Sequence, residues 1–299
     1  MDDLDDATPA AWFTRALEVP SEQRSVTVNG ALINYMDWGP HDAPGLVFVH
    51  GGAAHLHWWS FLAPLFADQY RVAALDLSGH GRSGRREQYA LEGWTDEIVA
   101  VAEELELPGP PVVIGHSMGG FITLATAGLH PDAVAGIVVI DSPVLREDPE
   151  SEEARQGNSF RPPKVYKTAE EMVSRFRTVP EQEHYVSFIM DHVARHSIVE
   201  VEGGYTWAFD PRVFSPWRNV VDDLLTTVKC RVALFGAEYG LLTHDIGEYM
   251  YERLGRVAPV VEIPEAGHHI MLDQPLSLLT GLRTLLADWE HSVPIAARH

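Results

Sequence analysis

Six short apolar runs, rich in β-branched residues, recur along the chain and constrain its fold more than any other feature. Each run is continuous rather than alternating, which is typical of strands that are buried on both faces, as in a parallel sheet. Helix-like segments, such as 95–105 and 119–129, lie between them. This alternation predicts βαβ units with right-handed crossovers, and therefore an α/β fold. The six runs are LVFVH (46–50), VAALDL (72–77), VVIGHS (112–117), GIVVID (136–141), VALFG (232–236) and VVEIP (260–264).

The segment 144–225 interrupts the alternation. It contains no strand-like run of that kind, and it opens with a polar stretch before continuing with helix-like pieces. Within it, Thr168 and Glu171 have the spacing of a helix capping box. The 299 residues are therefore predicted to form one core domain, 1–143 together with 226–299, and one inserted helical cap, 144–225.

The charge balance excludes some classes of partner. Lysine and arginine total 22 against 43 aspartate and glutamate residues, so the formal net charge is −21. Such a chain repels nucleic acids and anionic membrane surfaces. The single cysteine, Cys230, cannot form an intrachain disulfide, which suits a reducing compartment. No stretch approaches the ~20 apolar residues that span a bilayer, and the acidic start is unlike a secretory signal. We expect a cytoplasmic monomer or homodimer that binds neither nucleic acid nor membrane.

The sharpest motif is the hexapeptide GHSMGG around Ser117. It fits G-x-S-x-G, follows an apolar run and precedes a helix-like segment, which is the context of a strand–turn–helix elbow. Such a turn is so tight that Gly115 and Gly119 must lack side chains. The serine then stands clear of the sheet beside a helix N-terminus, whose dipole stabilises a negative charge forming there. Ser117 is therefore the candidate nucleophile.

A serine hydroxyl needs a base to take its proton, and position must choose among 15 histidines. Gly267, His268 and His269 directly follow the last strand-like run. A histidine there can reach the carboxyl edge of the sheet, where open α/β sheets place their sites. His268 and His269 are therefore the two candidate bases.

Four landmarks, in order, resemble the α/β-hydrolase superfamily along nearly the whole chain. The resemblance implies an eight-stranded, mostly parallel sheet flanked by helices, with a lid between strands six and seven, where the helical insertion falls. It also implies that Ser117 is the nucleophile and that His268, which directly follows the glycine, is the general base. The landmarks are His50-Gly51-Gly52 followed by Trp58, the turn DLSGHGRS at 76–83, the elbow at Ser117, and Gly267-His268 with Asp273 and Pro275 downstream.

The third member of such a triad, a carboxylate, has two candidates. In most of the family it is an Asp three residues after the Gly that ends strand seven, but here that position holds Tyr239, which cannot serve at neutral pH. Asp141 ends strand six, and some family members carry the acid there. Glu238 lies one residue before Tyr239. We favour Asp141, keep Glu238 as the alternative, and note that Asp141 could instead cap the following turn.

Donors for an oxyanion and walls for a substrate pocket follow from the same motifs. The elbow supplies the backbone N–H of Met118, and the family resemblance assigns the other donor to Gly52, with Ala53 as the alternative. Candidate substrate-binding residues are Trp58, Trp59, His116 and Trp207; core or lid packing is the competing interpretation for these side chains.

No cofactor is expected from the sequence. His55 and His57 have a spacing that suggests a metal pair, but a hydrolytic zinc site needs a third ligand, and none follows with suitable spacing. We therefore expect no metal.

A serine with a histidine base predicts hydrolysis of a carboxylic ester or lactone through an acyl-enzyme, on a small to medium, largely apolar substrate. C–C bond hydrolysis, acyl transfer and perhydrolysis use nearly the same residues and stay open. A hydrolase-like small-molecule receptor is the alternative from another class, and only turnover separates it from an enzyme.

Overall fold

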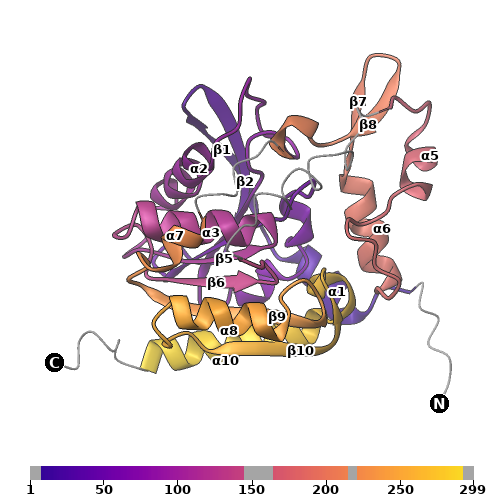
Figure 1. Ribbon diagram of the computed structural model, residues 1–299. Coiled ribbons are helices and arrows are strands. Elements are labelled where there is room, and N and C mark those ends of the chain that lie inside the picture. Colours follow the sequence, from indigo (N-terminus) through magenta and orange to yellow (C-terminus); the bar gives the residue numbers. More distant parts are fainter. Residues whose placement is uncertain (1–7, 145–163, 215–220, 292–299) are drawn as a thin grey trace, which may run out of the picture.

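An eight-stranded sheet forms the centre of the protein in the computed structural model, which describes residues 8–144, 164–214 and 221–291 (Figure 1). Its spatial order is β1-β2-β4-β3-β5-β6-β9-β10. The first two strands pair antiparallel with their neighbours and the rest pair parallel. The strands are β1 (Glu22–Val28), β2 (Ala31–Trp38), β3 (Gly45–Val49), β4 (Arg71–Leu75), β5 (Val112–His116), β6 (Gly136–Ile140), β9 (Arg231–Tyr239) and β10 (Val260–Gly267).

The predicted strand runs and the predicted fold class are confirmed. Every residue of β3, β4 and β6 is buried, as expected of strands covered on both faces. Asn29 and Gly30 join β1 to β2, both with positive φ angles, 47° and 81°, as a two-residue hairpin turn requires. The last strand is longer than predicted, because β10 continues past a register shift between Ile263 and Gly267.

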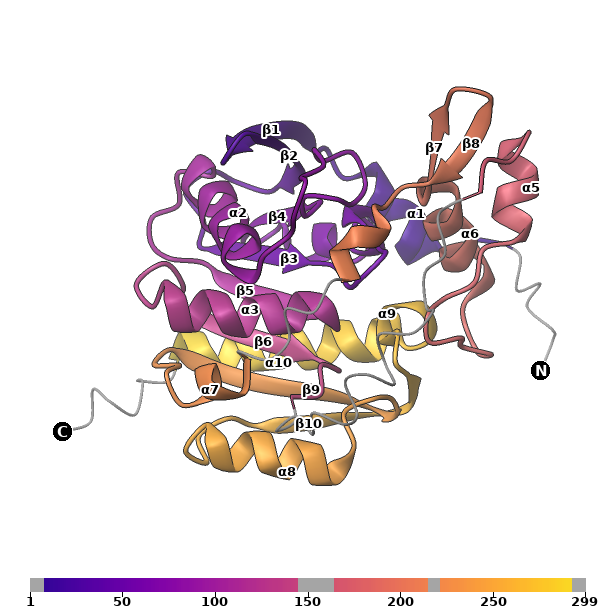
Figure 2. The same cartoon turned by 45° about the horizontal axis from the view of Figure 1, so that its top comes forward.

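Helices cover both faces of the sheet (Figure 2). Side chains of α2, α3, α7 and α8 share one apolar cluster with one face of the strands. Side chains of α1, α9 and α10, together with two short 3₁₀ helices, share a second cluster with the other face. These elements are α1 (Ala11–Glu18), η1 (Leu56–Trp58), η2 (Ala63–Phe66), α2 (Leu91–Glu104), α3 (Met118–Leu129), α7 (Val221–Leu225), α8 (His244–Arg253), α9 (Ile270–Asp273) and α10 (Pro275–His291).

The register of the parallel strands brings several loops to one edge. Val49 pairs with Gly115, His116 with Ile140, and Ile140 with Phe235. Because parallel strands point the same way, the residues that follow β3, β5, β6 and β10 emerge together at their carboxyl ends. Ser117, Asp141 and His268 are among these residues.

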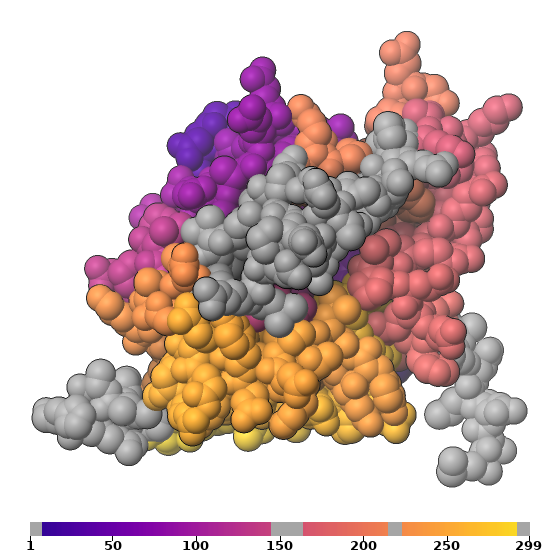
Figure 3. Space-filling view, in the orientation of Figure 1, coloured from indigo at the N-terminus to yellow at the C-terminus, as the bar shows by residue number. Residues whose placement is uncertain are grey.

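The described residues 164–214, which lie between β6 and β9 in the sequence, are next to this edge. In Figure 3 most of residues 164–214 lie to one side of the core. They form α5 (Ala169–Ser174), α6 (Ser187–His196), β7 (Ile198–Val201), β8 (Gly204–Trp207) and η3 (Pro211–Phe214). We call residues 164–214 the cap segment. The division of the chain into a core domain and a cap domain stays a prediction, and the polar stretch 146–158 lies outside the described residues.

The hairpin β7–β8 differs from the mainly helical insertion that the sequence predicted. Its strands pair antiparallel from Ile198 with Trp207 to Val201 with Gly204, and Gly203 takes a φ of 89° at the turn. The strands are short and only partly buried. They therefore lack the continuous apolar run by which the core strands are found. Within the described parts of the chain, no helix combines the length and apolar character needed to cross a bilayer.

Candidate active site

Ser117 occupies a sharp turn between β5 and α3. Its backbone has a φ of 55°, a strained value for a residue with a side chain. A Cβ atom at Gly115 would lie 2.3 Å from the carbonyl oxygen of Gly119, and one at Gly119 would lie 2.4 Å from that of His50. The two glycines are therefore required by close backbone approach, and the turn holds the serine at the N-terminus of α3.

A chain of hydrogen bonds joins Ser117, His268 and Asp141. The Nδ1 atom of His268 lies 2.6 Å from Oδ2 of Asp141, and its Nε2 atom lies 3.0 Å from Oγ of Ser117. An ionised carboxylate only accepts hydrogen bonds, so the proton of a neutral imidazole sits on Nδ1. Nε2 then carries a lone pair and accepts the hydroxyl proton of Ser117.

Asp141 is held by backbone donors as well as by His268. Its side chain is fully buried and accepts hydrogen bonds from the N–H groups of Leu241 at 2.8 Å and Leu242 at 3.1 Å. Burial alone opposes ionisation, but the hydrogen bond from His268 and these amides outweigh it, so the pKa of Asp141 is lowered. A Cβ atom at Gly240 would lie 2.4 Å from Oδ1 of Asp141, so the loop leaves space for the carboxylate alone.

The alternative acid, Glu238, has different surroundings. Its side chain is exposed, and its Oε2 atom accepts a hydrogen bond from the backbone N–H of Glu265 at 2.8 Å. Tyr239, which fills the usual position of the acid, has 64% of its surface exposed. The geometry thus brings Asp141, and not Glu238, to the imidazole of His268.

The loop after β3 lies against the serine turn. A Cβ atom at Gly51 would lie 3.3 Å from the Cβ of Ser117, and one at Gly52 would lie 3.7 Å from the sulfur of Met118. Ala53 takes a positive φ of 56°, which turns the loop sharply at this point. The loop of the candidate donor Gly52 therefore lies next to the side chain of Met118.

Two further histidines surround His268, and both are buried. Nε2 of His116 donates to the carbonyl oxygen of His268 at 2.9 Å, and Nε2 of His269 donates to that of Pro180 at 3.2 Å. Burial lowers the pKa of His116 to about 3 and that of His269 well below its usual value. Both rings are therefore neutral at pH 7. His269, the rival base, is bonded to the cap segment rather than to Ser117.

A glutamine of the cap segment braces the loop that carries His268. Oε1 of Gln182 accepts the backbone N–H of His269 at 2.9 Å, while its Nε2 donates to Oδ2 of Asp273 at 2.8 Å. The same Asp273 oxygen accepts the N–H of Gly267 at 2.6 Å, and burial raises the pKa of this carboxyl to about 6. Sequence reasoning missed Gln182, because nothing in its local sequence marks it.

The three candidate tryptophans lie in different surroundings. Trp59 is fully buried and packs against Phe48 at a ring separation of 5.1 Å, which matches the core-packing interpretation. Trp58 is nearly buried and lies 5.1 Å from the ring of His269. Trp207 lies on β8 of the cap segment, with its ring 6.0 Å from that of Phe176.

Comparison with known proteins decides the family. The alpha/beta hydrolase family model matches residues 46–279, most of the chain. The chain belongs to the alpha/beta hydrolase family. It is 25% identical over 267 residues to Esterase Rv0045c of Mycobacterium tuberculosis, covering 87% of this chain and 88% of that protein. The solved structure of E-2-(acetamidomethylene)succinate hydrolase superposes with a TM-score of 0.79 at 20% identity, covering 90% of this chain and 100% of that one.

Another relative shares only part of its length with this hydrolase. The acetyltransferase component of an acetoin cleaving system from Pseudomonas putida is 36% identical over 129 residues, which are 43% of this chain and 34% of that protein. The chain therefore spans about a third of that relative. Together with the family match, the esterase relatives support a hydrolase of esterase type.

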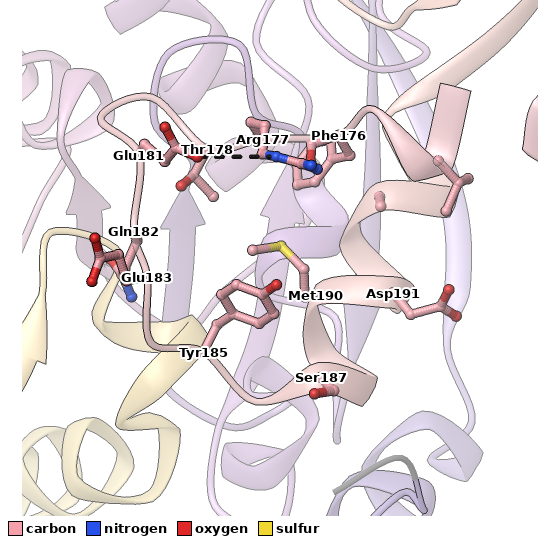
Figure 4. Close-up of a pocket in the computed structure, with 12 residues that line it drawn as sticks. Phe176, Arg177, Thr178, Glu181, Gln182, Glu183, Tyr185, Ser187, Met190 and Asp191 are labelled. Atoms are coloured by element: carbon pink, nitrogen blue, oxygen red, sulfur yellow. Dashed lines mark hydrogen bonds and ion pairs between the residues drawn. The ribbon is translucent and has the colours of Figure 1, made fainter. Parts of the chain in front are cut away.

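The cap segment of the hydrolase contains a pocket of its own, with a volume of about 560 Å³ (Figure 4). Its wall is largely polar: Arg177 and Glu181 face each other across 4.0 Å, and Asp191 contributes a further carboxylate. Gln182 also lines it. Among the described residues that line this pocket, none is Ser117, Asp141 or His268.

A second group of side chains that sequence reasoning missed lies where the cap segment meets the core of the hydrolase. The spacing of His55 and His57 offered no third metal ligand, yet the structure places His192 and His196 of α6 beside His57. Their separation by four residues on a helix was the available signal. The proximity of His192 and His196 to His57 could not be predicted from the sequence, because it depends on how the cap segment packs against the core.

Proposed function

We propose that this protein is a serine hydrolase that cleaves a carboxylic ester or lactone through an acyl-enzyme. The observation that carries the proposal is the continuous hydrogen-bonded chain from Ser117 through His268 to Asp141, at 3.0 and 2.6 Å. It lies at the N-terminus of α3 and beside the loop of Gly51 and Gly52. These are the parts that acyl transfer to a serine requires.

In the first half-reaction, Oγ of Ser117 attacks the carbonyl carbon of the ester while its proton moves to Nε2 of His268. The carbonyl oxygen becomes an oxyanion, and the backbone N–H groups of Met118 and Gly52 are the donors proposed for it. Collapse of this intermediate breaks the bond to the leaving oxygen, which takes the proton back from His268. The alcohol departs and the acyl group remains on Ser117.

In the second half-reaction, water hydrolyses the acyl-enzyme with the same residues. His268 takes a proton from water, hydroxide attacks the acyl carbon, and the proton then passes to Oγ of Ser117 as the acid leaves. Asp141 keeps the imidazole in the Nδ1–H tautomer and stabilises the imidazolium that forms in each half. Its lowered pKa keeps it ionised for this role at neutral pH.

An apolar substrate is supported by the side chain that covers the Gly52 loop. A Cβ atom at Gly52 would lie 2.8 Å from the ring of Phe214, so this ring, which belongs to η3 of the cap segment, rests directly on the loop. Phe209 packs near it at 6.2 Å. Substrate acyl groups of small to medium size and largely apolar surface would pack best against these two aromatic rings.

A substrate panel tests the proposal. Aryl esters of rising chain length, lactones and a vinylogous diketone are offered to the wild-type protein and to Ser117→Ala, with Ser277→Ala as the control for an exposed serine. We expect ester or lactone turnover in the wild type and in the control, and a loss of at least about 10³-fold in Ser117→Ala. Unchanged turnover in Ser117→Ala would end the proposal.

The same panel separates the alternatives. Cleavage of the diketone with no ester turnover would assign the triad to C–C bond hydrolysis instead. Binding of panel compounds without any turnover would point to the receptor class. A serine-directed phosphonate, added in parallel, is expected to abolish turnover in the wild type.

A further inference from the structure

Three histidines meet at the junction of the core and the cap segment. His57 lies in η1, directly after the Gly52 loop, and His192 and His196 lie one turn apart on α6. Each offers one ring nitrogen, and these nitrogens lie within 4.8 Å of one another. All three side chains are partly exposed, so an ion from solvent can reach them.

The hydrogen bonds of the cluster leave nitrogen lone pairs available. Nδ1 of His196 donates to the carbonyl oxygen of His192 at 2.8 Å, so Nε2 of the neutral ring is unprotonated. The ring of His57 stacks on that of His196, with centroids 3.8 Å apart. Oγ of Ser60 lies 3.0 Å from Nε2 of His192 and 3.3 Å from Nδ1 of His57. A backbone carbonyl that fixes the tautomer of a histidine is the usual partner of a metal-binding imidazole.

Charged groups of both signs surround the cluster, whose rings are neutral. Burial, aided by the neighbouring rings, lowers the pKa of His57 to about 2 and that of His192 to about 4, and burial likewise lowers the pKa of His196. The imidazoles are therefore neutral at pH 7. Arg82 adds positive charge beside His57 and His196, while Asp191 adds negative charge beside His192.

We propose that His57, His192 and His196 form a binding site for a divalent transition metal, best met by Zn²⁺. Three imidazoles without a carboxylate suit zinc and its neighbours rather than Mg²⁺ or Ca²⁺, which take oxygen ligands. Tetrahedral zinc with bonds of about 2.0–2.1 Å places its ligand atoms about 3.4 Å apart, so nitrogens that lie within 4.8 Å need to approach by up to about 1.4 Å. Solvent supplies the fourth ligand.

The site joins two parts of the chain that are far apart in sequence. His57 is five residues after Gly52, whereas the other two ligands belong to the cap segment. A bound ion would cross-link α6 to η1 and stabilise the folded protein by mass action. It shares no residue with Ser117, His268 and Asp141, so this inference does not depend on the proposed esterase activity.

A second histidine cluster, His116, His268 and His269, is the main competitor for the ion. Its members are buried, and Nε2 of both His116 and His269 is engaged with a backbone carbonyl. The experiment must therefore assign bound metal to one cluster or the other.

Zinc titration of the full-length, chelator-treated protein is the test. Isothermal titration calorimetry with Zn²⁺ is expected to show one site of micromolar or tighter affinity, and the midpoint of thermal unfolding is expected to rise with Zn²⁺. His57→Ala, His192→Ala and His196→Ala are each expected to lower the affinity at least about tenfold. The matched control is His244→Ala, an exposed histidine of α8, which keeps the wild-type affinity.

Two further measurements keep the result decisive. His192→Gln and His196→Gln preserve a polar side chain on α6, and circular dichroism without metal checks that each variant is folded. Co²⁺ absorption reports a nitrogen-ligated, four-coordinate ion in the wild type. Absence of micromolar Zn²⁺ binding would overturn the proposal. So would binding that survives substitution of His192 and His196, or binding that is lost in His269→Ala while His196→Ala retains it.

Discussion

The carboxyl edge of the sheet and the cap segment are held in different ways. At the edge, strained backbone and main-chain donors fix the side chains: Ser117 and Asp141 both have positive φ angles, and two loop amides hold the Asp141 carboxylate. The cap segment contacts the core partly through main-chain hydrogen bonds, such as that from Val186 N–H to the carbonyl oxygen of Leu272, and partly through side chains, as Gln182 does with the His268 loop. We therefore expect the edge to be intolerant of small changes, whereas a side-chain contact of the cap segment can be lost while the fold persists.

The largest effect is expected from the acid at the edge. Asp141→Asn keeps the shape of the side chain but cannot hold His268 in the required tautomer, so kcat/KM for an ester should fall about 10³- to 10⁴-fold. Glu238→Gln, the matched control on the neighbouring strand, should stay within about twofold, because its exposed carboxylate bonds the N–H of Glu265 rather than the imidazole of His268. Steady-state kinetics on an aryl ester measure both.

The opposite pattern, with Glu238→Gln inactive and Asp141→Asn active, would transfer the role to Glu238. It would also mean that the hydrogen bond of 2.6 Å between His268 and Asp141 serves the fold only.

A methyl group added at the serine turn should have the next largest effect. In Gly119→Ala the new Cβ would lie 2.4 Å from the carbonyl oxygen of His50 and 2.6 Å from that of Val49. Such crowding is expected to destabilise the protein by about 1–3 kcal/mol and to displace Ser117. Urea unfolding and ester turnover measure the two consequences.

The control for that change is Gly93→Ala in α2, where a Cβ atom meets nothing within 4 Å. Alanine is favoured over glycine inside a helix by roughly 0.5–1 kcal/mol, so this variant should be slightly stabilised and fully active. Equal stability of the Gly119→Ala and Gly93→Ala variants would show that the serine turn has space for a methyl group.

The contact between Gln182 of the cap segment and the His268 loop should have the smallest effect on activity when it is removed. Gln182→Ala removes the hydrogen bonds to His269 and Asp273, which loosens the loop of His268 without removing any group that reacts. We expect a loss of about three- to tenfold in kcat, because only part of the roughly 1 kcal/mol that each of the two hydrogen bonds contributes reaches the reacting groups, and an intact fold by circular dichroism.

Gln69→Ala, an exposed glutamine far along the chain from this loop, is the matched control and should behave as wild type. A loss in Gln182→Ala as large as that of Asp141→Asn would erase the distinction between the edge and the cap segment.

The same distinction explains what could be predicted from the sequence. The core strands and the nucleophile Ser117 could be predicted from the sequence. Continuous apolar runs indicate buried strands, and closely spaced glycines around a serine indicate a tight turn, and both patterns lie within a few consecutive residues. The sequence favoured Asp141 but kept Glu238 as an alternative, since both lie at the carboxyl ends of neighbouring strands and only the packing of loops decides which one faces His268. Gln182 and the histidines of α6 depend entirely on how the cap segment folds back, so their neighbours could not be read locally.

The central claim, that Ser117 carries an acyl group during turnover, is tested most directly by rapid-quench kinetics with mass spectrometry. Mixing the protein with an aryl ester should release a burst of about one equivalent of the phenol, and peptide mapping should find the acyl group on Ser117. Should deacylation be faster than acylation, the serine-directed phosphonate still reports the residue that reacts. An acyl or phosphonyl group found on another residue, or steady ester turnover with Ser117 never modified, would contradict the account.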